Sequence, residues 1–365
     1  MRSNRDIRCT PDAMPAPEHI DIPAFASCSE VPGFRLVAEP LRRVRGLIYQ
    51  QLTARCPGLA GLSSPPRRRR PEDVNRLLEY VSGRSGKMIR PALVLLAGRC
   101  CGKMTDEHVR AAAIIEMMHN ATLLHDDVID EGQTRRGLPT INSLWGNETA
   151  VLLGDLLLSR VFTMSAELRP PAAQVIAAAA VRLCEGELSQ AVQKNDWQLS
   201  ESEYIDAITE KSAVLFSSAC YLGALLAEAS EHHARSLAAF GLNAGIAFQI
   251  TDDLLDIIGD ERKTGKTLGS DIGAHKLTLA LIHLLRAVDE REKSAIIDLY
   301  LQRKDVQHDR DDLVRMLGRH GSLEYARGRT REFVAAAEHA LANVKQNDAR
   351  DALIETAEFM GDRTL

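Results

Sequence analysis

Apolar residues recur at the spacing of a helix face along most of this chain. Short breaks of Gly, Pro and Asn separate these stretches, and no alternating strand pattern competes with them. A first helix is expected to begin at Pro40 and to continue through Val44 and Ile48, until the prolines between Pro57 and Pro66 break it. Further helices are predicted at residues 74–81, 90–99, 106–130, 150–168, 172–193, 201–229, 233–259, 278–286, 290–301, 311–319 and 322–343.

The pattern predicts an all-α protein with one large helical domain. Hydrophobic residues make up 45% of the chain and aromatic residues only 4%, which favours packed helices over strands built from aromatic and β-branched residues. The stretch from Val175 to Leu183 is apolar on nearly all sides, so its helix is expected at the centre or in a subunit interface. Residues 1–35 carry five prolines and no periodicity, which predicts a poorly ordered tail before a domain at 36–365.

Net charge and cysteine usage indicate which partners and which cellular compartment to expect. The formal net charge of -5 predicts no general attraction to nucleic acid or to an anionic membrane, so phosphate chemistry must rely on local basic groups. Seven cysteines without a CxxC pair favour a reduced, cytoplasmic setting. No apolar run reaches the roughly 18 residues that a membrane-spanning helix needs, so no membrane span is expected.

Two similar aspartate-rich clusters each follow a long apolar run: Asp126-Asp127-Val128-Ile129-Asp130 and Asp252-Asp253-Leu254-Leu255-Asp256. On a helix, Asp126 and Asp130 project from one face, and two like charges that close need a cation. Magnesium prefers oxygen ligands and binds through one or two carboxylates together with substrate phosphates. A solvated helix end explains a single cluster, whereas two clusters favour matching walls around one metal site.

Basic residues follow both clusters. Arg135 and Arg136 come after the first, and Lys263, Lys266 and Lys276 come after the second. Arginine forks and lysine charges stabilise a departing diphosphate as its charge develops, which makes a diphosphate the predicted leaving group. Ion pairing between these side chains and the neighbouring aspartates is the alternative.

Other candidate residues share helix faces with the clusters. His119 lies seven residues before Asp126, and Gln249 lies three before Asp252. The pair Lys211-Ser212 and the segment around Lys87 add polar groups for phosphate, although an ordinary loop or a core histidine has the same local signature. The chain contains no GxGxxG, Walker lysine or HExxH, which argues against nucleotide and zinc chemistry.

Together these segments resemble the trans-isoprenyl diphosphate synthase, or polyprenyl synthetase, family over about residues 80 to 360. The matching motifs are Gly86-Lys87-Met88-Ile89-Arg90-Pro91, Leu124 through Arg136, Gly137-Leu138-Pro139-Thr140 with Asn142, Val151-Leu152-Leu153-Gly154-Asp155, Phe248 through Asp256, and Gly265-Lys266 with Asp271. Ser85, Met88, Ser212 and His275 depart from the family pattern, but none of them removes a metal ligand.

The resemblance implies an all-α fold around a deep apolar cavity, usually in a homodimer, and head-to-tail condensation of isopentenyl diphosphate with an allylic diphosphate. Its implied magnesium ligands are Asp126, Asp130, Asp252 and Asp256. The implied catalytic residues are Asp126, Asp127, Asp130, Arg135, Lys211, Asp252 and Lys266. The implied substrate-binding residues are Lys87, Arg90, His119, Arg135, Arg136, Lys211, Ser212, Gln249 and Lys266.

The resemblance also suggests how long the product grows. Ala121 and Thr122 stand where short-chain members similar to this chain carry bulky aromatics, and Met118 continues the same path. Small residues there favour a long-chain polyprenyl product. A short-chain farnesyl or geranylgeranyl synthase, a terpene cyclase and a non-catalytic partner subunit are the alternatives. The second aspartate cluster and the basic motif argue against a cyclase, and the retained aspartates argue against a non-catalytic subunit.

Overall fold

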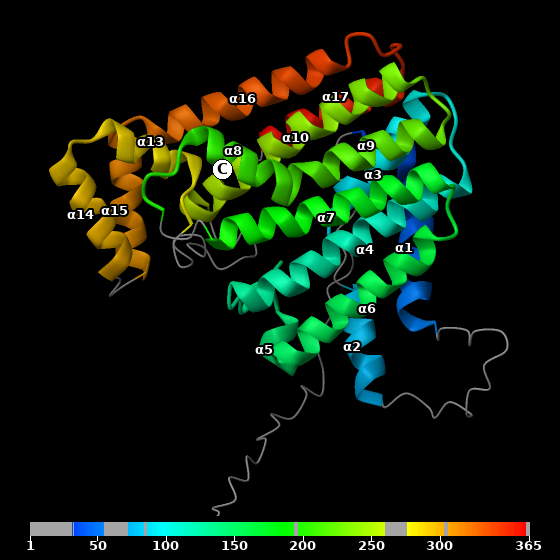
Figure 1. The fold of residues 1–365 in the computed structure, drawn as a ribbon, viewed down its shortest axis with the longest axis horizontal. Helices are drawn as coiled ribbons and strands as arrows, with labels where there is room; N and C mark the ends of the chain where they lie inside the picture. Colours follow the sequence, from blue (N-terminus) through cyan, green and yellow to red (C-terminus); the bar gives the residue numbers. More distant parts are fainter. Residues whose placement is uncertain are drawn as a thin grey trace, which may run out of the picture.

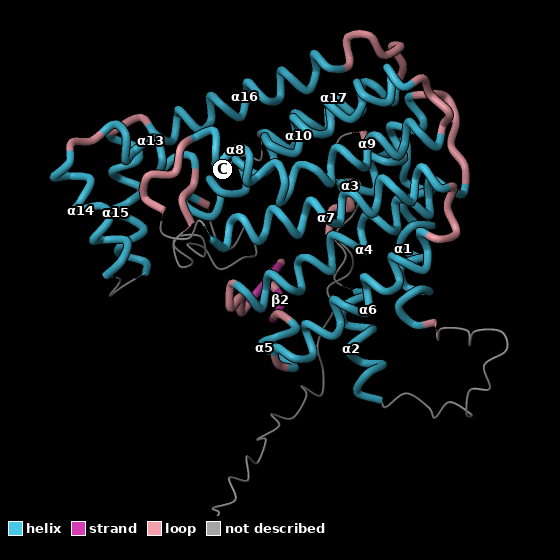
Figure 2. Tube along the Cα trace, in the orientation of Figure 1, coloured by secondary structure: helices cyan, strands magenta, loops and turns pink. Residues whose placement is uncertain are grey.

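Long helices run side by side in the part of the chain that the structure describes (Figure 1). The computed structural model describes residues 31, 33–54, 72–83, 86–192, 196–259, 276–302 and 306–362. Within these ranges, the only strands are β1 (Thr134–Arg135) and β2 (Leu138–Pro139), which form a small antiparallel hairpin with Thr134 opposite Pro139 (Figure 2). The predicted all-α fold is confirmed.

Helical elements make up most of the described residues. In chain order they are η2 (Phe34–Val37), α1 (Ala38–Thr53), α2 (Glu72–Gly83), α3 (Ile89–Cys100), α4 (Asp106–Ile129), α5 (Ile141–Trp145), α6 (Asn147–Ser165), α7 (Pro170–Val192), α8 (Glu201–Ile208), η3 (Thr209–Ala213), α9 (Val214–Leu226), α10 (Glu231–Ile258), α13 (Leu279–Ala287), α14 (Glu290–Gln302), α15 (Val306–Arg319), α16 (Ser322–Ala340) and α17 (Asp348–Gly361).

Several features differ from the sequence prediction, which included neither the hairpin nor the short helices η2 and α5. The single helix expected at residues 201–229 is divided into α8, the π-helical turn η3 and α9, because a π turn shifts the register without changing the apolar pattern. The helix α17 was not predicted. Its N-terminus is capped by the side chain of Asn347, which accepts the backbone N–H of Arg350 at 2.9 Å, and it buries Leu353 and Met360.

The helix α10 connects two hydrophobic cores. Leu237 and Phe240 in its first half belong to the larger core, which also contains α3, α4 and α9. Ile250 and Leu254 in its second half belong to a smaller core with α8, α13 and α16. In Figure 1, α10 lies beside α9 and α17, and α16 covers it. The first half of α10 is therefore fixed in the larger core, and its C-terminal half, which carries the second aspartate cluster, is fixed in the smaller core.

The helices α3 and α9 approach unusually closely at Gly223. A Cβ atom there would stand 2.8 Å from the Cβ of Ala97 and 2.9 Å from the backbone nitrogen of Gly98. His108 of α4 reaches the same point: its Nδ1 accepts the N–H of Thr105 at 3.0 Å, which leaves Nε2 to donate to the carbonyl of Gly223 at 3.1 Å. Burial lowers the pKa of His108, in keeping with a neutral ring.

Apolar packing begins before the expected domain boundary. Val31 and Phe34, which precede residue 36, are buried in the larger core. Residues 1–30 lie outside the described residues, so the poorly ordered tail stays a prediction. Among the described helices, none combines the length and the apolar character needed to cross a membrane.

Replacing Gly223 by alanine is expected to destabilise the protein by about 1–3 kcal/mol, because its methyl group meets backbone atoms of α3 that cannot rotate away. The matched control is Gly46→Ala in α1, where nothing lies within 4 Å of the added atom. That variant should gain about 0.5–1 kcal/mol from helix propensity. Urea unfolding followed by circular dichroism measures both, and equal effects at the two positions would contradict the close approach.

Candidate active site

Both aspartate clusters lie at the C-terminal ends of long helices. Asp130 is the C-cap of α4, and Asp256 lies two residues before the end of α10. The C-terminal end of a helix carries partial negative charge, so carboxylates placed there are repelled by the backbone as well as by one another. This arrangement does not by itself stabilise the fold, but it is the arrangement that a cation-binding site requires.

The first cluster is crowded by further negative charge. Burial raises the pKa of Asp126 to about 6, and Glu187 and Asp130 raise it as well, while Lys211 and Arg135 act in the opposite direction. Glu187 comes from α7, so a third helix adds a carboxylate to this wall. The sequence analysis did not single out Glu187.

Lys211 is held by α7. Its Nζ donates to the carboxylate of Glu187 at 2.9 Å and to the side-chain oxygen of Gln190 at 2.8 Å. Gly186 permits this contact, because a Cβ there would stand 2.6 Å from the backbone nitrogen of Lys211. Lys211 belongs to the π-helical turn η3, and such turns within longer helices recur at functional sites.

The residue after Lys211 connects this turn to the second cluster. Ser212 donates to the side-chain oxygen of Gln249 at 2.7 Å, and Gln249 donates to Oδ1 of Asp253 at 2.8 Å. The hydroxyl of Tyr204 donates to the other oxygen of Asp253 at 2.6 Å. Two adjacent residues of η3 therefore reach the two clusters, Lys211 the first on α4 and Ser212 the second on α10.

Ion pairs account for some of the basic residues near the clusters. Nε of Arg135 donates to Oδ1 of the buried Asp127 at 2.6 Å, and Nζ of Lys276 donates to Oδ2 of Asp130 at 3.0 Å. These contacts are the ion pairing that the sequence left open as an alternative. The pair between Lys276 and Asp130 ties the end of α4 to the segment before α13.

A separate group of basic residues surrounds the start of α3. The guanidinium of Arg136 occupies the space that a Cβ at Gly86 would fill, so Gly86 and Arg136 meet although they are fifty residues apart. Arg90 lies over the ring of Phe216 at 4.0 Å, and Lys87 lies over that of Phe359 at 4.8 Å.

The backbone at both ends of this group is strained. Met88 at the N-cap of α3 and Arg136 in the hairpin turn have φ values of 57° and 56°, which non-glycine residues rarely adopt. Strain of this kind concentrates at binding and catalytic sites. The basic motif and Arg136, which are separated in the sequence, therefore form one cluster.

The remaining predicted residues lie on α4 or outside the residues that the structure describes. His119 is half-buried, and its carbonyl accepts the hydroxyl of Thr122 at 2.8 Å. Ala121 and Met118 are buried in the larger core. Lys266 and Lys263 lie outside the described residues.

The described part of the chain does not form a metal site that consists of protein ligands alone. There, no three His, Cys, Asp or Glu side chains gather closely enough for such a cage. The donor set around Asp126 and Asp252 consists of carboxylates, which suit magnesium or calcium rather than zinc. A site of this type takes its remaining ligands from water and substrate phosphate.

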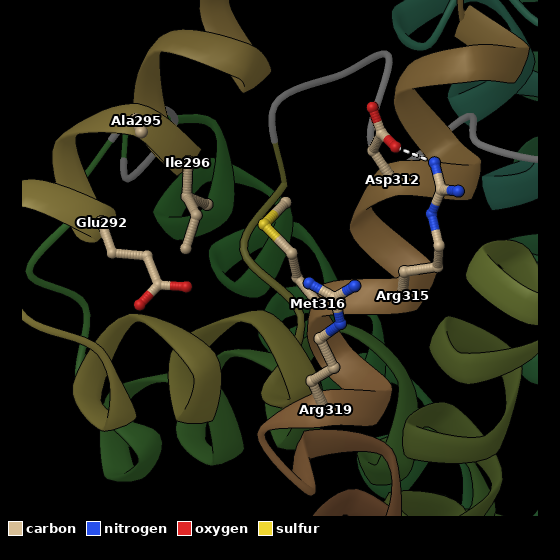
Figure 3. A pocket seen from close by; sticks show the side chains of 7 residues that line it. All are labelled: Glu292, Ala295, Ile296, Asp312, Arg315, Met316 and Arg319. Atoms are coloured by element: carbon tan, nitrogen blue, oxygen red, sulfur yellow. Dashed lines mark hydrogen bonds and ion pairs between the residues drawn. The ribbon is translucent and has the colours of Figure 1, made fainter.

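A cavity of about 400 Å³ lies elsewhere, between α14 and α15. It is lined by Glu292, Ala295, Ile296, Asp312, Arg315, Met316 and Arg319. Figure 3 shows Asp312 directed toward Arg315 of the same helix, with which it forms an ion pair. Acidic and basic groups balance one another around this cavity, and none of the predicted site residues lines it.

Removing the first carboxylate of the site is expected to stabilise the metal-free protein. The pKa of Asp126, about 6, lies above the ordinary value of 3.8, so the wild type loses stability as the pH rises from about 4 to about 6. In metal-free buffer at about pH 8, Asp126→Asn should unfold at a higher temperature than the wild type, and the two should converge near pH 4.

The matched control for this comparison is Asp130→Asn, which takes the ion-pair partner from Lys276 and should not stabilise the protein. Thermal unfolding followed by circular dichroism measures all three proteins. If the unfolding midpoint of Asp126→Asn near pH 8 lies at or below that of the wild type, the ionised carboxylate of Asp126 does not destabilise the metal-free protein.

Comparison with known proteins agrees with this geometry. The family model described as polyprenyl synthetase matches residues 71–317. An octaprenyl diphosphate synthase from Escherichia coli is 35% identical over 285 residues, which cover 78% of this chain and 88% of the relative. A short chain isoprenyl diphosphate synthase from Methanothermobacter thermautotrophicus is 33% identical over 298 residues, which cover 80% of this chain and 91% of the relative.

A solved structure shares the fold over nearly the whole chain. The polyprenyl synthase from Caulobacter crescentus, complexed with calcium and isoprenyl diphosphate, superposes with a TM-score of 0.84 at 30% identity, over 93% of this chain and 98% of that one. The range of the family model, residues 71–317, contains both aspartate-bearing helices. This chain therefore belongs to the polyprenyl synthetase, or trans-isoprenyl diphosphate synthase, family and is a transferase of prenyl groups.

Proposed function

We propose that this enzyme condenses isopentenyl diphosphate head-to-tail with an allylic diphosphate in a magnesium-dependent reaction, and that it makes a long-chain all-trans polyprenyl diphosphate. One observation carries the proposal. The acidic clusters of α4 and α10 are joined through Lys211 and Ser212, while a second cluster, in which basic side chains are in excess, forms around Arg90 and Arg136. Two diphosphates, one bound with metal and one without, fit this division.

The acidic side suits the allylic diphosphate. Asp126, Asp130, Asp252 and Asp256 would hold magnesium, which supplies positive charge to the leaving diphosphate when bound. The excess of carboxylates at two helix ends supports the assignment, and the solved relative from Caulobacter crescentus contains calcium, a cation with the same preference for oxygen.

The basic and polar residues near this site stabilise the departing diphosphate. Lys211 stands between Glu187 and Asp126 and supplies a point charge, and Gln249 supplies its amide. Arg135 and Lys266 complete the proposed set, with Asp127 holding Arg135 in place. As the bond to the diphosphate breaks, the hydrocarbon becomes an allylic cation, and donors fixed before the reaction stabilise the charge that leaves.

The second cluster would hold isopentenyl diphosphate. Lys87, Arg90 and Arg136 supply the charge, and His119 on α4 supplies a donor. Held in this way, the double bond of isopentenyl diphosphate attacks the allylic cation and forms the new carbon–carbon bond. The proton that is then lost passes to the released diphosphate. Placing the two reactants against each other is the main contribution of the protein.

We propose that the enzyme is a homodimer. In the single chain, several large apolar side chains of α6 and α7 are exposed to solvent: Val151, Leu152, Phe162, Val181, Leu188 and Val192. Leu188 is 68% exposed and Val192 85%, and such patches mark protein interfaces. A second copy of the chain covers them with the same surface. Sedimentation equilibrium at micromolar concentration measures the subunit number, and a monomer would contradict this proposal.

We also place the enzyme in the cytoplasm. The four cysteines of the described part, Cys100, Cys101, Cys184 and Cys220, are free thiols, although Cys100 and Cys101 are neighbours in the chain. Reduced thiols fit a reducing compartment. Cell fractionation beside a cytoplasmic marker protein tests this assignment.

The central experiment incubates the enzyme with magnesium, labelled isopentenyl diphosphate and farnesyl diphosphate, and sizes the extracted lipid. Elongated product is expected, and chelation of the metal should abolish it. Asp252→Asn and Asp126→Asn should each lower turnover by about a hundredfold or more, because charge on the leaving group is no longer compensated.

The matched control is Asp106→Asn, which removes an exposed carboxylate from the first turn of α4, where it pairs with Arg43. It should leave turnover unchanged. No elongation from any allylic primer would refute the proposed reaction and would favour the non-catalytic subunit.

Product length gives a further test. Ala121 is fully buried on α4, and the helix continues below it through the equally buried Met117 and Ile114. A phenylalanine at position 121 would stand where the growing chain has to pass, so Ala121→Phe should shift the products to about three or four isoprene units by steric exclusion. Met104→Leu, outside this path and partly exposed, is the control. Chromatography of the products decides, and an unchanged length distribution in Ala121→Phe would refute the role of this position in setting product length.

A further inference from the structure

Glu116 is a buried carboxylate in the middle of α4. Only 3% of its surface is exposed, less than for any other Asp or Glu side chain among the described residues. Its neighbours Ile115 and Met117 are fully buried. An ionised carboxylate in such surroundings is unfavourable unless positive charges lie close to it.

Three arginines provide that charge. Burial raises the pKa of Glu116, and Arg136, Arg90 and Arg45 oppose this effect, in that order. They come from the hairpin, from α3 and from α1, which are three separate elements. Three positive charges face one negative charge, so the group as a whole keeps a positive surplus that an anion can compensate.

Two of these arginines are already held on one side. The guanidinium of Arg90 lies against the ring of Phe216 at 4.0 Å, and that of Arg136 lies against the backbone at Gly86. Neither contact counters the repulsion between the two guanidiniums. Glu116 supplies the negative charge that keeps them together, and it does so from α4, the helix that also carries Asp126.

We infer that Glu116 is a positioning residue of the metal-free diphosphate site, where it holds Arg90 and Arg136, with Arg45 behind them, in the arrangement that receives isopentenyl diphosphate. The inference rests on the proposed function, because it concerns the second of the two diphosphate sites. Glu116 itself touches no substrate in this arrangement. It acts through the two guanidiniums, whose forks need a fixed orientation to bind phosphate oxygens in pairs.

Because Glu116 is negatively charged, the direction in which diphosphate binding changes on its neutralisation tests its role. A carboxylate that merely added negative potential would weaken diphosphate binding, and its removal would strengthen binding. A carboxylate that positions the arginines has the opposite consequence, because the guanidiniums separate when it is neutralised. The direction of the change in the KM for isopentenyl diphosphate therefore separates the two roles.

The experiment is steady-state kinetics of Glu116→Gln, which keeps the shape and removes the charge. The KM for isopentenyl diphosphate should rise about tenfold or more through misplacement of the binding groups, while the KM for farnesyl diphosphate and the magnesium dependence stay as in the wild type. Glu116→Asp, which keeps the charge on a shorter side chain, should recover part of the loss. If Glu116→Gln does not fold, as shown by circular dichroism, Glu116→Asp alone should show a smaller rise in the same constant.

Two controls make the result specific. Glu107→Gln makes the same change on the same helix, where Glu107 pairs with Arg169 far from the site, and it should leave all constants unchanged. In an Arg136→Lys background, Glu116→Gln should add little further loss, because the fork that it positions is already gone.

The outcomes separate the inference from the function on which it rests. A wild type that does not elongate with isopentenyl diphosphate refutes the proposed function. An active wild type with an unchanged or lower KM for isopentenyl diphosphate in Glu116→Gln overturns the inference alone, and so does an equal rise in both substrate constants.

Discussion

The concentration of negative charge at two helix ends is the constraint on which the rest of the site depends. Asp130 caps α4 and Asp256 lies in the last turn of α10, where the backbone already carries partial negative charge. Without nearby cations such ends repel each other and separate. Lysines from other elements offset part of the charge of the first cluster, Lys211 from η3 and Lys276 from the segment before α13.

These lysines are effective only because the backbone brings them close. Gly186 lets α7 approach the π turn, so that Glu187 and Gln190 can hold the ammonium group of Lys211. The same turn aims Ser212 at Gln249 and thus reaches the second cluster. A regular α-helical turn at this place would rotate one of the two side chains away. The irregularity of η3 is therefore part of how two distant helices share one site.

The sequence predicted what depends on local spacing and missed what depends on contact. The helical pattern, the two aspartate clusters and the partners Lys211 and Gln249 are visible as residue types at fixed intervals. Glu187 and Tyr204 are single polar residues within ordinary helical stretches, and only packing brings them to the aspartates. The π turn was missed because it does not change the apolar periodicity, whereas α17 does have the apolar spacing of a helix face after Asn347 and was overlooked.

The helix α4 joins all parts of the proposed mechanism. From Glu116 to Asp126 is ten residues, or about 15 Å along a helix axis, and Ala121 lies halfway. Glu116 beside the basic site, the proposed product floor at Ala121 and Asp126 of the acidic site are therefore positions on one helix, which Thr105 and His108 cap at its start. A substitution at Ala121 changes volume between two charged groups without moving either. In the proposed mechanism, product length would be set at Ala121 while the charged groups on either side of it keep their positions.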